Sequence, residues 1–136
     1  LMMFTKLIHK LCKSYEEEHE LSNLVQLLKP FSKEWSELSM KIGMKAMKNH
    51  DEAGSASFDF LMYSGYVVLG YFHLKMAITA VQLLNDKVTL EEEGIDEGFL
   101  KNKIQLAKFY FARILPRTES LKTSMMADIE SLNPVW

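Results

Sequence analysis

Histidine, cysteine and acidic side chains are the residues of this chain with which it could bind a metal or transfer a proton. The histidines fall in four separate segments and lack the spacing of a metal-binding motif: His9, His19, His50 and His73. Cys12 is the only cysteine, which excludes an internal disulfide and a cysteine-rich metal cluster. No nucleophile elbow, P-loop or glycine-rich dinucleotide turn is present. We therefore predict no catalytic, cofactor-binding or metal-binding residue in the chain.

Charged clusters are the remaining chemical signal. The acidic runs at residues 16–20 and 91–93 are most simply solvated surface. Along residues 99–117, one helical side would carry Lys103, Tyr110, Arg113 and Arg117. That side could face an acidic partner or a phosphate, although a charged outer face is the simpler interpretation. The net charge of −2 argues against a nucleic-acid partner, which would require a concentrated basic surface.

The elements that must position these residues all read as helices. A first helix is predicted at about residues 2–14, and a capping box of Ser14 and Glu17 could start the next one. An apolar stripe then steps by three and four residues straight through Pro30: Leu21, Leu24, Leu28, Phe31, Trp35, Leu38 and Ile42. This phase predicts one helix over about 17–49, bent at the proline, with two separate helices as the open alternative. The small polar residues around Gly54 are predicted to end it.

The second half predicts two more long helices. One covers about residues 56–84, and an acidic loop follows at 85–96. Asp96 is placed to cap a helix that starts near Glu97, kinks at Pro116 and reaches about residue 130. The predicted fold is therefore all-α: a single domain over 1–136, an up-and-down four-helix bundle with long, Pro-kinked helices. Because Leu1 already lies in a helical pattern, we expect a C-terminal fragment of a longer chain.

Residues 60–84 could alternatively be a membrane span, since they are long and apolar enough. Lys75, however, lies past the middle of this segment, where a charge costs about 2.5–3.5 kcal/mol. Polar groups also line two sides of it. We therefore predict a central core helix and no membrane.

Small residues and methionines within these helices suggest how they pack. Gly65 and Gly70 would allow a neighbouring helix to approach closely, so Gly65→Leu is expected to destabilise the fold by overpacking. A ligand groove against these glycines is the alternative. Met40, Met44 and Met47 have helical spacing and are most simply core residues, although an adaptable binding groove would use them too.

Two segments together resemble a known family. "FDFLMYSGYVVLGYFHLKMAITA" followed by "FLKNKIQLAKFYFARILPRTESLKTSM" is similar to the C-terminal helical domain of flavin-dependent acyl-CoA dehydrogenases, in the branch of methylmercaptopropionyl-CoA dehydrogenase. The resemblance rests on a glycine-containing aromatic helix, a phenylalanine-led helix and its "ILP" ending. Its matching positions are Phe99, Lys103, Ala107, Phe109, Tyr110 and Ile114–Pro116. The connection at 85–96 appears longer than is usual in that family.

The resemblance implies a non-catalytic appendage of a cytoplasmic enzyme of fatty acid metabolism. The whole flavoprotein would oxidise an acyl-CoA substrate with FAD, using groups in upstream domains. This domain would pack on the catalytic core or at a subunit interface of a homo-oligomer, so we expect an exposed apolar patch on it.

Two other functions remain open from the residues alone. The chain could be a free-standing helical interaction or dimerisation module that uses its methionine-rich and aromatic faces. It could also carry a small ligand in a cavity lined by Gly65, Tyr66 and Gly70.

Overall fold

The computed structural model describes residues 1–17 and 19–133, and this part of the chain is helical without a strand. The main helices are α1 (Met2–Tyr15), α2 (Ser22–Leu28), α3 (Phe31–Lys48), α4 (Asp51–Leu84), α5 (Lys87–Glu93), α6 (Glu97–Phe109) and α7 (Thr118–Met125). Between α6 and α7 lie a π-helical turn, η1 (Tyr110–Ile114), and a 3-10 turn, η2 (Leu115–Arg117). A last 3-10 turn, η3 (Ile129–Leu132), follows α7.

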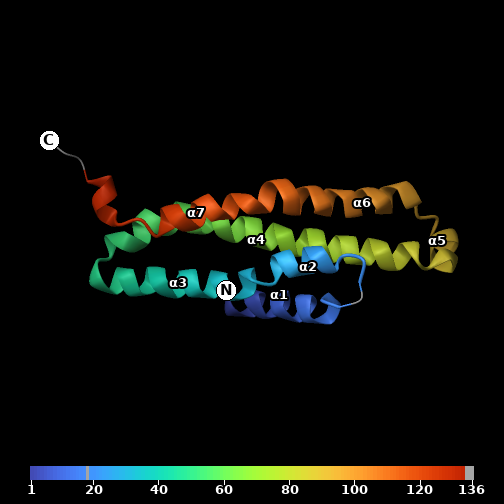
Figure 1. Ribbon diagram of the computed structural model, residues 1–136, viewed down its shortest axis with the longest axis horizontal. Helices are drawn as coiled ribbons and strands as arrows, with labels where there is room; N and C mark the ends of the chain where they lie inside the picture. Colours follow the sequence, from blue (N-terminus) through green and yellow to red (C-terminus); the bar gives the residue numbers. More distant parts are fainter. Residues whose placement is uncertain (18, 134–136) are drawn as a thin grey trace.

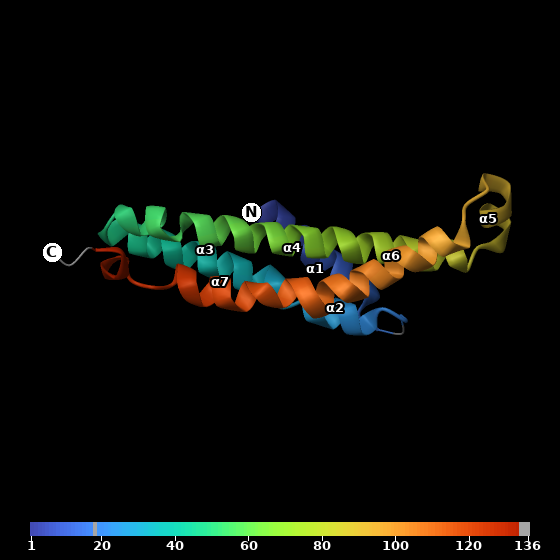
Figure 2. The same cartoon turned by 90° about the horizontal axis from the view of Figure 1, so that it is seen from above.

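Helix α4 is the axis around which the other elements pack. Figure 1 shows it between the α6–α7 arm and the α2–α3 arm, with α1 beside the latter. Its buried side includes Tyr63, Val67, Leu74 and Ala77, which form one core with residues of α1, α2, α3 and the α6–α7 arm. Burial of these apolar side chains supplies the main stabilisation of the bundle. The predicted central core helix is therefore present, and Figure 2 shows α5 projecting at one end of it.

Helix α1 is attached to this core through aromatic contacts. The Phe4 ring lies 5.1 Å from that of Tyr71 and 5.9 Å from that of Trp35, in edge-to-face geometry. Trp35 also donates its indole N–H to Ser64 at 2.9 Å. Because edge-to-face pairs add to the energy of simple burial, these contacts fix α1 against α3 and α4.

The predicted helix over 17–49 is interrupted. Residues 29 and 30 keep right-handed helical backbone angles, but α2 ends at Leu28 and α3 begins at Phe31. The reason is that Pro30 has no N–H to donate, so the hydrogen-bond ladder breaks although the apolar phase continues. The predicted capping box is also wrong: Ser14 donates its hydroxyl to the Lys10 carbonyl within α1, and α2 begins only at Ser22.

Two predicted loops are helical. Gly54 lies inside α4, which starts at Asp51 directly after a short connection. The acidic segment 85–96 contains α5, which Asp86 caps by accepting the Thr89 N–H at 3.2 Å and which Gly94 ends with a φ of 62°. Glycine adopts this left-handed conformation without steric cost.

The arm after residue 97 is helical past Pro116, but it is not one regular helix. It changes from α to π to 3-10 geometry across Tyr110–Arg117 and ends as α7 at Met125, short of the predicted residue 130. The all-α fold class is thus confirmed. The finer prediction of an up-and-down bundle of four long, Pro-kinked helices is not confirmed, because α2 and α5 are additional elements.

Candidate functional site

One side of α4 carries large apolar side chains that the other described elements leave exposed or only partly covered. Phe58 and Leu61 are 70% and 69% exposed, and Leu69 is 50% exposed. We call this surface the α4 stripe, and its members are Phe58, Leu61, Met62, Gly65, Leu69, Phe72 and Met76. Their spacing of three and four residues places them on one helical face.

Gly65 lies in the middle of the α4 stripe and faces open space. A Cβ built at Gly65 would meet no atom within 4 Å, whereas one at Gly70 would lie 3.5 Å from side-chain atoms of Leu28, Tyr110 and Leu115. Close helix packing is therefore correct at Gly70 and wrong at Gly65. Sequence spacing could not separate the two positions, because apolar residues occur around the whole circumference of α4.

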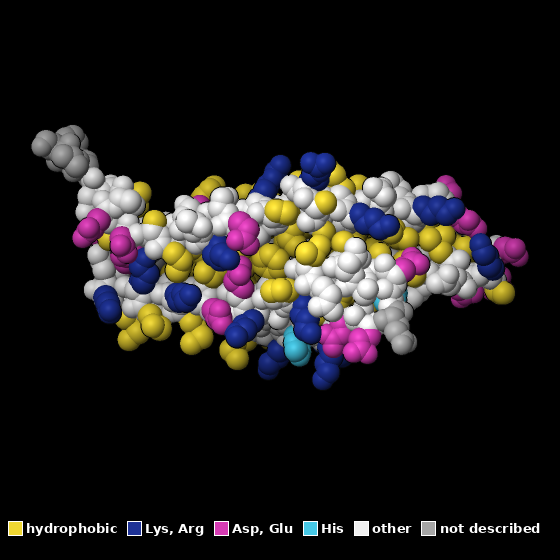
Figure 3. All heavy atoms as spheres, in the orientation of Figure 1, with side chains coloured by type: hydrophobic (Ala, Val, Ile, Leu, Met, Phe, Trp, Pro, Cys, Tyr) yellow, Lys and Arg dark blue, Asp and Glu magenta, His cyan; other side chains and the backbone are white. Residues whose placement is uncertain are grey.

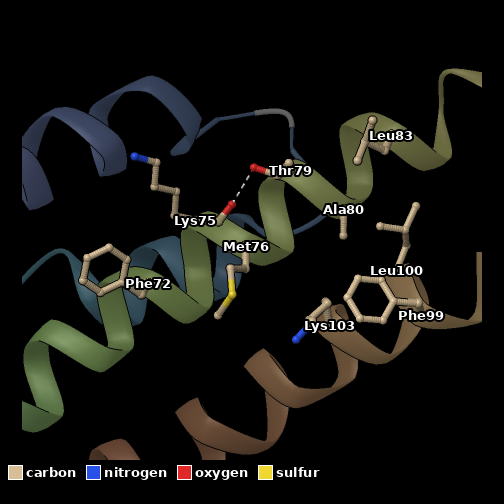
Figure 4. Close-up of a pocket in the computed structure, with 9 residues that line it drawn as sticks. All are labelled: Phe72, Lys75, Met76, Thr79, Ala80, Leu83, Phe99, Leu100 and Lys103. Carbon is tan, nitrogen blue, oxygen red and sulfur yellow. Dashed lines mark hydrogen bonds between the residues drawn. The ribbon is translucent and has the colours of Figure 1, made fainter. Parts of the chain in front are cut away.

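A groove between α4 and α6 adjoins the C-terminal part of the stripe. It encloses about 590 Å³ and is open on one side. Figure 4 shows the residues that line it: Phe72, Lys75, Met76, Thr79, Ala80, Leu83, Phe99, Leu100 and Lys103. This α4–α6 groove is not lined by Gly65, Tyr66 or Gly70, the residues of the predicted cavity.

The α4–α6 groove is apolar with a basic edge. The Lys103 amine points between the two helices (Figure 4), 5.0 Å from the centre of the Phe99 ring. The Lys75 amine leans the other way, 5.8 Å from the Tyr71 ring centre. No ion pair holds either lysine among the residues that the structure describes. Lysine stems add apolar surface here while their charges remain accessible.

His73 lies next to this groove and stacks on an aromatic ring. Its imidazole is 4.6 Å from the Tyr110 ring at an interplanar angle of 26°. Partial burial, and to a smaller extent the positive charge of Lys103, hold the pKa of His73 below its ordinary value. The structural interpretation of this histidine therefore fits the observed packing.

A partly buried polar network lies at the edge of the core. Tyr63 donates its phenolic O–H to a Glu34 carboxylate oxygen at 2.6 Å, and Lys122 contacts the other carboxylate oxygen at 3.3 Å. Burial, followed by the hydrogen bond to Glu34, raises the pKa of Tyr63 above its ordinary value. This set ties α3, α4 and α7 together, and all of its polar groups are partnered, so it reads as a structural network.

The basic side predicted on residues 99–117 is not one continuous exposed face. Tyr110 is buried and donates its O–H to the Tyr66 carbonyl at 2.5 Å, whereas Arg113 and Arg117 are exposed. Core filling by Met40, Met44 and Met47 is also wrong, since these residues are 67%, 61% and 85% exposed. Figure 3 shows hydrophobic side chains along the outer edge of α3. We call Met40, Met44 and Met47 the α3 methionine face.

Metal ligands and unsatisfied polar groups are the remaining chemical features to consider in the described residues. These residues contain no group of three or more His, Cys, Asp or Glu placed to hold a metal ion. They also leave no buried side-chain N or O atom without a hydrogen-bond partner.

Helix α4 also meets the length and composition criterion for a membrane span. It is the one such helix in residues 1–17 and 19–133, and 44% of its most apolar window is buried inside the protein. Core helices of soluble proteins satisfy the same criterion.

Comparison with known proteins gives one family. The family model described as acetyl-CoA dehydrogenase C-terminal like matches residues 4–134. No curated protein and no solved structure matches the chain. The match covers α2 to α7 and all but the first two residues of α1.

Proposed function

Because the chain belongs to the family of acetyl-CoA dehydrogenase C-terminal-like domains, we propose that it is a non-catalytic helical domain of an FAD-dependent acyl-CoA dehydrogenase. Its role is to dock on the catalytic domains or at a subunit interface. In the finer assignment, the parent is an enzyme of the methylmercaptopropionyl-CoA dehydrogenase branch, cytoplasmic and homo-oligomeric. The two quoted segments of the second half support that branch.

The α4 stripe is the observation that carries this proposal. Large contiguous apolar patches on a soluble protein usually mark an interaction site. Phe58, Leu61 and Leu69 are each at least half exposed although they belong to the helix at the centre of the core. A docked protein surface would remove them from water at roughly 25 cal/mol per Å² of apolar area.

Docking and redox chemistry belong to different parts of the proposed parent enzyme. In the parent enzyme, FAD would accept the hydride from the acyl-CoA substrate and an upstream carboxylate would take the proton. This domain's own residues supply shape and apolar area, with Gly65 leaving room for a side chain of the partner surface. We therefore assign docking to this chain and redox chemistry to the rest of the enzyme.

The test is association with the catalytic domains encoded in the same reading frame, measured by sedimentation of the two separately produced parts. Leu61→Glu together with Leu69→Glu is expected to abolish the complex, because docking would then bury two carboxylates that have no partners. Met40→Glu with Met44→Glu on α3 is the matched control and should leave it intact. Loss of the complex only in the α3 variant would contradict docking through the α4 stripe.

A second measurement concerns the chain by itself. The purified domain is expected to show no flavin absorbance and no dehydrogenase turnover with acyl-CoA substrates, since the proposal assigns both to the upstream domains. Measurable turnover would defeat the non-catalytic assignment.

The α3 methionine face favours one alternative function, a free-standing interaction or dimerisation module. Flexible, polarisable methionines suit a surface that adapts to a partner. In that case the isolated chain would sediment as a dimer, and Met44→Glu would return it to a monomer. A monomeric wild-type chain at high concentration would remove this alternative.

A further inference from the structure

The α4–α6 groove combines an apolar floor with cationic groups that have no internal partner. Phe72, Met76, Leu83, Phe99 and Leu100 supply most of its wall. At about 590 Å³ it falls in the range of small-molecule sites, about 300–1,000 Å³. Along α4 it runs from Phe72 to Leu83, which corresponds to on the order of 16 Å at 1.5 Å per residue. This shape suits an extended aliphatic chain.

The charged groups of the groove indicate which head group a ligand would carry. Its only formally charged lining residues are Lys75 and Lys103. The Thr79 hydroxyl already donates to the Lys75 carbonyl at 3.0 Å, so the lysine amines are the available donors. Glu97, in the first turn of α6, contacts Lys87 and Lys101 instead. The groove therefore presents positive charge without a matching anion.

We propose that the α4–α6 groove binds a fatty acid, with the alkyl chain along α4 and α6 and the carboxylate paired with Lys103. The Lys103 amine is the anchor because it points into the space between the helices (Figure 4), while Lys75 lies at the rim. A carboxylate needs only one such charged donor, since charge-assisted hydrogen bonds are the stronger kind. A nucleotide or pyrophosphate head would need a cluster of donors, which the lining lacks.

The groove shares Phe72 and Met76 with the α4 stripe, but its binding activity can be tested apart from docking. The α4 stripe residues that the docking test changes, Leu61 and Leu69, do not line the groove. Failure of one proposal therefore leaves the other to be judged on its own measurement.

The experiment is calorimetric titration of the 136-residue chain with laurate, held below its micelle concentration, and with dodecanol as the uncharged analogue. Saturable binding of one laurate per chain, with weaker binding of dodecanol, is expected. Lys103→Met should lower the laurate affinity about tenfold, because loss of a charge-assisted bond is worth about 1.4 kcal/mol or more. The methionine keeps the apolar stem, so the alcohol should bind the variant as it binds wild type.

Two further variants decide whether the site is the groove. Lys108→Met, at an exposed position on the same helix outside the lining, is the matched control and should leave laurate binding unchanged. Met76→Glu places a carboxylate on the half-exposed wall and should abolish laurate binding. Absent binding, equal affinity for alcohol and acid, or an equal loss in Lys108→Met would each overturn the proposal.

Discussion

Gly65 and Gly70 are five residues apart on α4 and meet opposite surroundings. Gly70 faces Leu28, Tyr110 and Leu115, each with an atom 3.5 Å from a built Cβ. Gly65 faces nothing within 4 Å. The same substitution at the two positions therefore separates helix propensity from packing.

We predict opposite signs for the two leucine variants. Gly70→Leu should destabilise the fold by about 1–3 kcal/mol, because the added side chain has no room in the core. Gly65→Leu should stabilise it by up to about 1 kcal/mol, because a helix-forming residue replaces glycine at an open site. Urea unfolding followed by circular dichroism measures both. A Gly65→Leu variant less stable than wild type would mean that this face is packed in the isolated chain.

The Cys12 thiol makes stability depend on pH in the alkaline range. Cys12 is fully buried in the core, and this burial raises the pKa of its thiol from 9.0 to about 11. Below about pH 9 both states keep the proton, so the contribution is constant. Between about pH 9 and pH 11 the unfolded chain releases the proton while the folded chain retains it, so stability falls as pH rises.

The size of this loss approaches about 2–3 kcal/mol near pH 11. Cys12→Ala should lower stability at neutral pH through a small cavity, yet it should lose less on going from pH 8 to pH 10.5. Comparing the two chains removes the titration of lysines and tyrosines that both share. Parallel stability curves across that range would contradict the assignment to Cys12.

At the scale of elements, helix α6 depends on the cap at its start. Asp96 has extended backbone angles, and its carboxylate accepts the Gly98 N–H at 2.8 Å. We predict that Asp96→Ala destabilises the protein by about 1 kcal/mol, since it leaves a terminal donor without its partner. Asp96→Asn should retain most of the stability. Glu91→Ala on exposed α5 is the control, and an equal effect there would argue against capping.

Helix type was predictable wherever an apolar stripe was long and continuous. Asp96 as a cap and the helical phase through Pro30 both followed from residue spacing. The break at Pro30 did not, because an apolar phase continues whether or not the backbone hydrogen bonds do. The helix α5 was missed because its run of Glu91, Glu92 and Glu93 reads as a loop, although its Asp86 cap and its Gly94 end were signals for a short helix.

The candidate site was harder to predict from the sequence than the fold. Apolar residues occupy every side of α4, so periodicity could not distinguish its core side from the α4 stripe. The α4–α6 groove depends on how α4 and α6 separate toward α5 (Figure 1). Lys103 was expected on a basic helical side that could face an acidic partner, a phosphate or, more simply, solvent. Its position beside an apolar wall required the three-dimensional arrangement.

At the scale of the whole molecule, Lys45 joins the C-terminal segment to the body. Its amine donates to the Met126 carbonyl at 3.1 Å and lies 3.6 Å from carboxylate oxygens of both Glu52 and Asp128. These contacts connect α3, α4 and the approach to η3. Because these groups are partly exposed to solvent, each contact of the Lys45 amine stabilises the fold by about 1.5 kcal/mol or less.

We predict that Lys45→Met releases this end of the molecule selectively. Amide hydrogen exchange should become faster across residues 126–132 while α4 retains its protection, because local opening requires only these few contacts. Lys41→Met on the exposed side of α3 is the control. Uniformly faster exchange throughout the chain would indicate global rather than local destabilisation.

The burial of the sole cysteine has a practical consequence for spectroscopy. Because Cys12 is enclosed by core side chains and its thiol is protonated at neutral pH, maleimide probes should not react with the native chain. A cysteine introduced at Phe58 or Met47 would then be the sole labelled position without any background substitution. Spin labels or fluorophores attached there would report distances from these two surfaces in the isolated chain.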